Sequence, residues 1–366
     1  MRFKNFYNDW EETRLDNQAM IVDGTHQTPD YKTQGVKFVS VENIKDPYLT
    51  NKYISREDYE QFKVKPQIGD IFMTRITAGV IGETYVIDKK EDLAYYVSLA
   101  LIRPKDNINS NFLSYYINSS YFKHSLDRRI IKVAFPRKIN LNDIGECPIK
   151  LCDVKEQEKI SSFLELIDQR IFTQIKIIDN LESQKKYISK SLFDSLNCKT
   201  QLCMLCNIKK GQQLNGDKLL DSGMYYMMNG GITPSGFTNT FNTIENTISI
   251  SEGGNSCGYV QYNLDKFWSG GHCYTLEEIN PIINNKFLYH FLKHKENEIM
   301  SLRIGTGLPN IQKKDLERFL VPTPTIEQQI KIIKVLDAID NKLKLLREQL
   351  VQFNLAKKYL LNNMFI

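Results

Sequence analysis

The chain has 366 residues, more than one average core requires, and its 42% hydrophobic and 25% charged content is ordinary for a soluble globular protein. A formal net charge of +5, from 48 basic and 43 acidic side chains, allows a nucleic-acid partner without demanding one. The N-terminal residues contain no apolar signal region, and the longest apolar run, near residues 95–102, is too short to cross a bilayer. We therefore expect a cytoplasmic protein of two or more domains that makes no membrane contact.

Residues 1–152 are expected to form a first globular domain, and the fold class is expected to be α+β. Short β-prone runs separated by turn residues predict strands at 37–41, 70–74, 82–87 and 95–103, followed by a helix at 111–123.

Two groups of residues in this domain are candidates for contact with DNA. Basic side chains that follow the predicted helix suit phosphate groups: Arg128, Arg129, Lys132, Arg137 and Lys138. Polar loop residues that could read base edges are Thr25, His26, Thr28 and Arg75. A solvated surface or a turn-forming role is the alternative for each group.

Residues 153–197 predict a long helix that begins at a capping box formed by Asp153 and Glu156. Its apolar side chains recur at alternating spacings of four and three, which is typical of a coiled-coil seam: Ile160, Leu164, Ile167, Ile171, Ile178, Leu181, Ile188 and Leu192. Lys185 interrupts this seam.

Residues 198–324 are expected to form a second globular domain, with strands at 247–251, 258–262 and 272–276 and a helix at 285–294. Its candidate base-reading residues are Asn229, Asn255, Ser256, Thr306 and Asn310, and its candidate phosphate contacts are Arg303, Lys313 and Lys314. Cys198, Cys203 and Cys206 lie close together, but their spacing is irregular and nothing completes a tetrahedral set, so we expect free thiols rather than a metal.

Residues 325–366 predict a second long helix with a second seam: Ile332, Leu336, Ile339, Leu343, Leu346, Leu350, Phe353 and Leu360. Displacing the sequence by 172 residues superimposes the two helical segments without a gap, so that Gln157 falls on Gln329 and Lys185 on Lys357. Such a repeat predicts a pseudo-two-fold molecule in which the two helices pair antiparallel within one chain. A stalk that dimerises with a second chain is the alternative.

No motif in the sequence indicates catalysis. The glycine-rich loops of dinucleotide and nucleoside-triphosphate sites are absent, as is the Asn/Asp-Pro-Pro-aromatic tetrapeptide of amino-methyltransferases. His290 and His294 lie four residues apart on a predicted helix without the glutamate of the zinc-protease arrangement. We therefore expect a binding protein with no catalytic residue, no metal and no cofactor.

Two divergent globular regions alternating with two similar helices resemble the specificity subunit of type I restriction–modification systems. The helices open with Glu156-Gln-Glu-Lys-Ile160 and Gln328-Gln-Ile-Lys-Ile332, and Asp9-Trp10-Glu11 and Gly307-Leu-Pro-Asn-Ile311 resemble the borders of target-recognition domains. The first helix lacks the proline-rich lead-in of the second.

This resemblance implies two target-recognition domains that each read half of a bipartite, asymmetric double-stranded DNA site. It also implies docking of two methyltransferase (modification) subunits, with restriction subunits joining the complex. A coiled-coil scaffold that carries two protein-binding heads is the alternative function. The sequence does not identify the DNA target or the gap between its halves.

Overall fold

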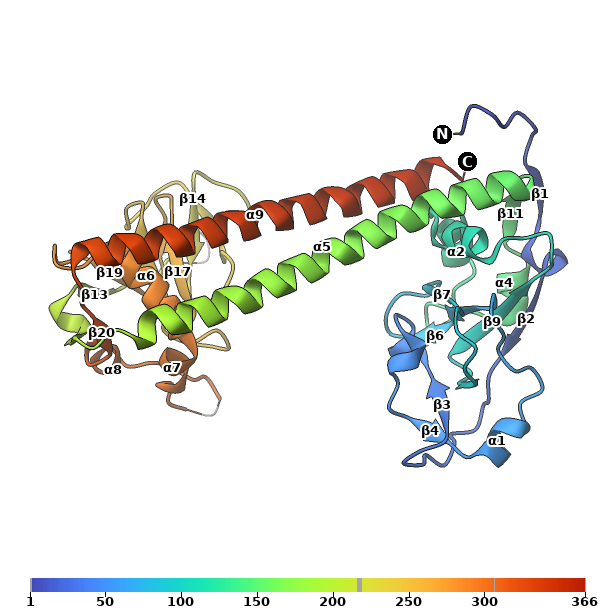
Figure 1. Cartoon of the computed structure of the whole chain (residues 1–366), viewed down its shortest axis with the longest axis horizontal. Helices are drawn as coiled ribbons and strands as arrows, with labels where there is room; N and C mark the ends of the chain where they lie inside the picture. The colour runs from blue at the N-terminus through green and yellow to red at the C-terminus, as the bar shows by residue number, and fades with distance from the viewer. Residues whose placement is uncertain (1, 216–218, 306, 366) are drawn as a thin grey trace. The chain divides into compact units, whose positions relative to one another are not determined.

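The computed structural model describes residues 2–215, 219–305 and 307–365, and the chain divides into two compact units (Figure 1). Unit 1 comprises Met1–Ile175 and Gln349–Ile366, and unit 2 comprises Lys176–Glu348. Two long helices, α5 (Val154–Asp194) and α9 (Ile326–Asn363), each contribute one part to each unit. We call the globular part of unit 1 head 1 and that of unit 2 head 2.

Head 1 contains a four-stranded antiparallel sheet in the order β2-β9-β5-β7 and a three-stranded sheet in the order β4-β3-β8. Two further strand pairs, β1 with β11 and β6 with β10, are antiparallel. Its strands are β1 (Glu11–Arg14), β2 (Ala19–Asp23), β3 (Val36–Val39), β4 (Tyr53–Ile54), β5 (Ile71–Thr74), β6 (Ile76–Thr77), β7 (Thr84–Val86), β8 (Leu93–Tyr95), β9 (Leu99–Pro104), β10 (Arg137–Lys138) and β11 (Pro148–Leu151). Its α-helices are α1 (Arg56–Glu60), α2 (Ser110–Asn118), α3 (Ser120–Asp127) and α4 (Leu141–Gly145).

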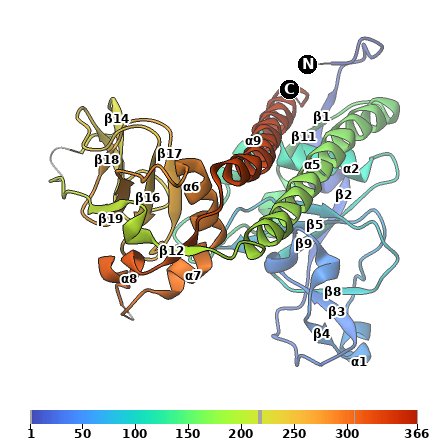
Figure 2. The same ribbon diagram turned by 60° about the vertical axis from the view of Figure 1, so that its left-hand side comes forward.

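Head 2 repeats this topology with a different sequence (Figure 2). Its four-stranded sheet has the order β13-β19-β16-β17, its three-stranded sheet has the order β15-β14-β18, and β12 pairs with β20. Its strands are β12 (Lys199–Gln201), β13 (Asn207–Lys210), β14 (Tyr225–Met228), β15 (Gly236–Thr238), β16 (Thr247–Ser251), β17 (Val260–Asn263), β18 (Trp268–Ser269), β19 (Cys273–Glu277) and β20 (Leu320–Pro322). Its α-helices are α6 (Asn285–His294), α7 (Glu296–Ser301) and α8 (Lys313–Glu317).

The two heads therefore correspond strand for strand in chain order through both main sheets. Even the parallel pair recurs, as β3 with β8 in head 1 and β14 with β18 in head 2. Strands β5 and β16 are buried along their whole length. One face of each packs on helices, as Ile71 does on α2 and Ile248 on α6, while Phe72 on the other face of β5 packs on residues of the second sheet. The internal repeat thus includes the folds of the two heads as well as the two helical segments whose sequences align.

Two predicted elements of head 1 are interrupted in the structure. The strand expected at 95–103 is divided between β8 and β9 by a turn at residues 96–98. The carbonyl of Ser98 in this turn accepts hydrogen bonds from the amides of Arg75 and Ile76. The helix expected at 111–123 is divided at Ser119, whose hydroxyl accepts a hydrogen bond from the amide of Phe122 and caps α3. In both places a local polar contact overrides the apolar pattern.

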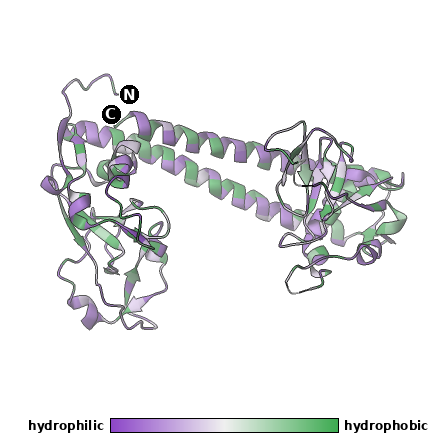
Figure 3. Ribbon diagram, turned by 180° about the vertical axis from the view of Figure 1, so that it is seen from behind, coloured by the Kyte–Doolittle hydropathy of each residue, from purple (hydrophilic) through white to green (hydrophobic). Residues whose placement is uncertain are grey.

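Within each unit, α5 and α9 run in opposite directions. In unit 2, Lys185 pairs with Asp340 and Glu182 with Arg347. In unit 1, Gln174 bonds to Gln349 at 3.2 Å, and Asp168 pairs with Lys357 at 2.5 Å. Figure 3 shows that hydrophobic and hydrophilic residues alternate along both helices, as expected where only one face is covered.

The apolar residues at the predicted seam positions all lie on covered faces. Seven are buried: Ile160, Leu164, Ile178, Ile332, Leu336, Leu343 and Leu346. The other nine are partly buried: Ile167, Ile171, Leu181, Ile188, Leu192, Ile339, Leu350, Phe353 and Leu360.

Candidate nucleic-acid interface

Each head is fixed to the start of a long helix by a buried glutamine. In unit 1, Gln157 donates to the Cys152 carbonyl at 2.8 Å and accepts from the amide of Asn109, the residue that caps α2, at 2.9 Å. In unit 2, Gln329 donates to the Pro324 carbonyl at 2.9 Å and accepts from the amide of Asn284, which caps α6, at 2.7 Å. The repeated glutamine therefore makes the same joint twice.

The end of the other long helix packs on the same head helix through an aromatic side chain. Phe365, after α9, contacts Phe112 and Tyr116 of α2 with ring centroids 5.5 and 5.4 Å apart. Phe193, near the end of α5, contacts Phe287 and Phe291 of α6 at 5.8 and 5.3 Å. Each head is thus held by the start of one helix and the end of the other, which gives its loops a rigid support.

Head 2 carries a polar cleft of about 550 Å³ that brings together four of the predicted base-reading residues. Its lining includes Asn229, Asn255, Ser256 and Asn310, together with Lys210, Glu252 and His272. Asn229 holds the rim in place, because its side-chain oxygen accepts from the His272 amide at 3.0 Å. Asn255 and Asn310 are exposed and Ser256 is partly buried.

Glu252 is the buried acid of this cleft. Lys210 pairs with one of its oxygens at 2.5 Å, and Tyr274 donates to the same oxygen at 3.3 Å. The other oxygen accepts no hydrogen bond from a described residue and lies 3.6 Å from Nδ1 of His272. Burial and the carboxylate of Glu252 raise the pKa of Tyr274 to about 12. The cleft therefore offers amide groups and a cation, with the carboxylate of Glu252 buried at its wall.

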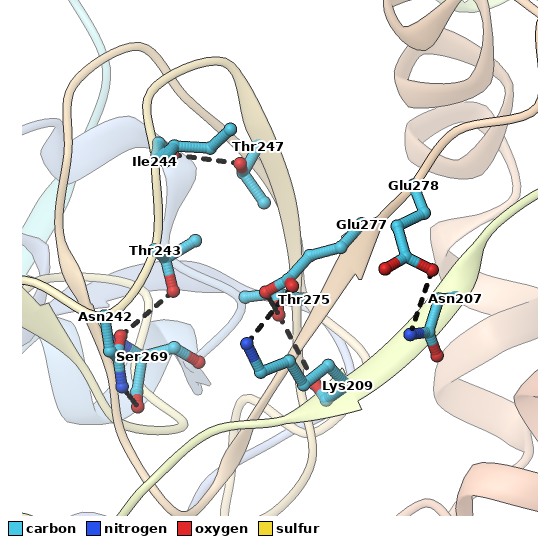
Figure 4. Close-up of polar contacts among 10 residues, drawn as sticks. All are labelled: Asn207, Lys209, Asn242, Thr243, Ile244, Thr247, Ser269, Thr275, Glu277 and Glu278. Atoms are coloured by element: carbon cyan, nitrogen blue, oxygen red, sulfur yellow. Dashed lines mark hydrogen bonds and ion pairs between the residues drawn. The ribbon is translucent and has the colours of Figure 1, made fainter.

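Sequence reasoning missed Lys210, Glu252 and His272, although Glu252 directly precedes a glycine pair, Gly253-Gly254. The neighbouring Lys209 does not add to the cleft's charge, because it donates to Glu277 across the sheet at 3.2 Å (Figure 4). Thr275 donates to the same carboxylate at 2.9 Å.

The remaining predicted residues of head 2 lie outside the cleft lining. Arg303 is exposed, as are Lys313 and Lys314 at the start of α8, and Lys313 lies 3.7 Å from Glu317. Thr306 lies outside the described residues.

In head 1, Arg75 is buried, and its Nε and Nη1 atoms donate hydrogen bonds within the head. It donates to Asp23 at 2.9 Å, to the Val97 carbonyl at 2.9 Å and to the Ile139 carbonyl at 3.2 Å. Burial lowers the pKa of Arg75, and the charge of Asp23 opposes that effect. The Arg75 side chain thereby ties together three segments of the head.

The loop before β3 holds the other candidate readers of head 1. Thr25 forms a bridge with Tyr96 and is partly buried, whereas His26 and Thr28 are exposed. His26 lies 3.1 Å from Asp23, the carboxylate that Arg75 also contacts. Arg75 and this loop are therefore linked through one acid.

The predicted basic cluster of head 1 follows α3. Arg128, Lys132, Arg137 and Lys138 are exposed and Arg129 is partly buried. Some of these cations have local partners: Lys132 pairs with Asp127 at 2.9 Å, and Arg129 donates to the Ser125 hydroxyl at 2.8 Å. The two heads thus present different chemistry, a cationic loop on head 1 and a mixed polar cleft on head 2.

The duplicated heads and joints have a counterpart among known families. A family model for the type I restriction modification DNA specificity domain matches residues 7–183 and 200–354. The chain belongs to this family. Each matched range contains one head with helical segments, which agrees with the internal repeat.

Specificity subunits are also found among individual relatives. A putative type I restriction enzyme specificity subunit of Methanocaldococcus jannaschii is 24% identical, over 97% of this chain and 92% of its own length. Putative type I specificity subunits of Mycoplasma pneumoniae and Mycoplasma genitalium are 40% and 34% identical. These two matches span 43% and 47% of this chain but only 42% and 41% of those relatives.

Solved structures share the fold along the whole chain. The S subunit of a type I restriction–modification system from M. genitalium has a TM-score of 0.67 at 19% identity, covering 100% of this chain and 97% of its own. A chain from a study of assembly and conformational transition of the type I system has a TM-score of 0.61 at 15% identity, covering 97% of both chains. Among the described helices, none is long and apolar enough to span a membrane.

Proposed function

We propose that this specificity-family chain is a sequence-specific DNA-binding subunit of a type I restriction–modification complex. Each head reads one half of a bipartite, asymmetric site. The observation that carries this proposal is the duplicated joint: Gln157 and Gln329 fix two heads of one topology to two equivalent helices. The halves of the site differ because the surfaces of the two heads differ.

In this proposal α5 and α9 form an antiparallel coiled coil that sets the gap between the half-sites. Support comes from the covered seam residues and from contacts that run in opposite directions in each unit. A two-headed reader fixes half-site separation through protein geometry.

The chain makes no catalytic contribution of its own and docks two methyltransferase subunits, which restriction subunits then join. Exposed apolar residues at equivalent positions of the helices support two copies of one partner. Tyr187 and Tyr359 occupy matching positions of the repeat and are 76% and 57% exposed. Because the repeat makes the two positions equivalent, two copies of one partner would meet the same side chain on each helix.

Within head 2, we assign base reading to the cleft. Asn255 and Asn310 are exposed and suit adenine, whereas Glu252 is buried and holds Lys210 at the cleft. Phosphate contacts fall to exposed cations of both heads: Arg128, Lys132, Arg137, Lys138, Arg303, Lys313 and Lys314.

Within head 1, His26 and Thr28 remain candidate readers because they are exposed. We reassign Arg75 from reading bases to supporting the loop, since it is buried and its Nε and Nη1 atoms already donate within the head.

The test is to co-express the chain with a methyltransferase encoded beside it and to map methylated adenines across the host genome. We expect one split motif, with two short specified halves around a fixed unspecified gap, that disappears when the chain is deleted. Methylation that is unchanged by the deletion would favour the alternative function, a coiled-coil scaffold with two protein-binding heads. Binding of duplex DNA that weakens with salt separates the two functions directly.

A further inference from the structure

The loop between α3 and β10 of head 1 exposes two large apolar side chains. Val133 is 98% exposed and Phe135 is 89% exposed. The loop is nevertheless closed at its base, where the Ile131 amide donates to the Lys138 carbonyl at 2.8 Å. Arg137 fastens one side by donating to the Gly79 carbonyl at 2.7 Å. The structure therefore holds the apolar tip away from the core.

Cations flank this apolar tip on both sides in the sequence. Arg128 and Lys132 precede Val133, while Arg137 and Lys138 follow Phe135, and all four are exposed. The acid in this stretch, Asp127, is already paired with Lys132. A ligand for the tip must combine negative charge at its edge with apolar surface at its centre.

Head 2 places an apolar residue on the equivalent loop. The Ile304 amide donates to the Asn310 carbonyl at 2.8 Å, and Asn310 returns the bond at 3.0 Å, so this loop is closed at its base as well. Leu308 is 86% exposed and precedes a proline, as Phe135 does. Isolated exposed apolar residues are common, but in both heads the exposed side chain stands directly before a proline in a loop whose base is closed by a backbone hydrogen bond.

We propose that Phe135 of head 1 and Leu308 of head 2 are wedges that contact the bases of duplex DNA, each inserting against one base-pair step of its half-site. The flanking cations hold the phosphates on either side. Proteins that insert apolar side chains at a base step unstack it partly and kink the duplex, and flexible pyrimidine–purine steps accept this most readily. This inference rests on the proposed function, because it names how the same heads engage DNA.

The charge favours DNA over a protein partner at these loops. Duplex DNA presents closely spaced phosphates around stacked apolar bases, which matches an exposed tip of Val133 and Phe135 with two exposed cations before it and two after it in the chain. Docking of a methyltransferase through the same tip is therefore the outcome that would contradict the proposal.

The experiment uses the full chain in complex with its methyltransferase and the target duplex found by methylation mapping. Phe135→Ala is expected to weaken specific binding by on the order of tenfold, the size expected for losing one stacked contact. The dependence of binding on salt should stay as in wild type, because no phosphate contact is lost. Phe135→Trp should restore binding, since a larger ring can still insert.

A 2-aminopurine placed at successive positions of the half-site reports unstacking. We expect wild type and Phe135→Trp to raise its fluorescence at one step and Phe135→Ala to abolish that increase. Leu49→Ala is the matched control, because Leu49 is 79% exposed on a different segment of head 1.

Three outcomes would overturn the inference. If wild type binds specifically and Phe135→Ala binds equally well without loss of the signal, the wedge is wrong and the proposed function stands. If Phe135→Ala instead releases the methyltransferase, the loop is a protein contact. If wild type shows no sequence-specific binding at all, the proposed function itself fails.

Discussion

At the residue scale, Gln329 concentrates several contacts in one side chain. It is fully buried, donates to two carbonyls and accepts from the amide that begins α6. Gln329→Ala leaves these groups without partners, so we expect a loss of about 2–3 kcal/mol and a fall of several degrees in the Tm of unit 2. Thermal unfolding followed by circular dichroism measures this effect. Lys334→Ala, at an exposed position of α9 within unit 2, should leave the Tm unchanged.

The contacts of Gln329 could be predicted from the sequence only in part. The repeat identified Gln157 and Gln329 as equivalent, but their partners come from the caps of α2 and α6, which lie dozens of residues away. Similarly, Arg75 looked like a base reader because arginine commonly contacts guanine. Only the fold places it beside Asp23, where it supports a loop.

The burial of His290 makes the stability of unit 2 depend on pH. It is buried on α6 between Asp337 and Asp340 of α9, with Lys185 of α5 paired to Asp340 and with Lys286 and Tyr289 beside it on α6. Burial lowers the pKa of His290 below its ordinary value of 6.5, and the hydrogen bond and charge of Asp337 oppose this only in part.

The unfolded chain therefore binds a proton more readily than the folded chain in the window just below pH 6.5. Stability is fully present above this pH and is lost as the pH falls through the lowered pKa of His290. We expect the Tm to drop between pH 7 and 5.5, and His290→Gln to remove most of that drop. Burial also lowers the pKa of His294, so the Tm of the double variant His290→Gln/His294→Gln should depend even less on pH. An unchanged slope in both variants would contradict this assignment.

At the element scale, the two long helices are joined by ion pairs that the repeat makes equivalent. Lys357 pairs with Asp168 in unit 1, and Lys185 pairs with Asp340 in unit 2. Because these side chains are partly exposed, solvent screening limits each pair to about 1 kcal/mol or less.

Lys357→Glu places two acids together and should lower the Tm of unit 1 by a few degrees. Adding Asp168→Lys reverses the pair and should recover most of the loss, because the hydroxyl of Tyr115 that now donates to Asp168 can also accept. Lys358→Glu, at the exposed neighbouring position, is the control. A double variant no more stable than the single one would show that the ion pair contributes nothing.

The helices were the elements most readily predicted, because their apolar spacing persists for dozens of residues and occurs twice. The matching β topology of the heads was not visible, since the sheet order depends on pairing between distant strands such as β2 and β9. Short polar interruptions were missed for a related reason. Ser119 ends one helix and caps the next through hydrogen bonds that no apolar pattern encodes.

At the scale of the whole molecule, two heads of one topology carry surfaces of different chemistry. Head 2 offers a cleft with amide groups and Glu252, whereas head 1 offers an exposed apolar tip with exposed cations on both sides of it in the sequence. If the heads read DNA separately, a change in one must alter one half of the target and leave the other half intact. Loss of a base contact and loss of a phosphate contact should also have different effects, because only base contacts carry sequence information.

We therefore expect Asn255→Ala/Asn310→Ala to relax one half of the methylated motif and to preserve the other half and the gap, at a discrimination cost of about 1–3 kcal/mol for each lost base contact. Arg137→Ala/Lys138→Ala should weaken methylation at all targets alike and reduce the salt slope of binding by about 2. Single-molecule sequencing of methylated genomes and binding titrations at several salt concentrations measure the two effects. Relaxation of both halves by the head 2 variant would mean that the heads do not read independently. An unchanged motif would remove the cleft residues from the reading surface and leave the flanking loops of head 2 as its only candidates.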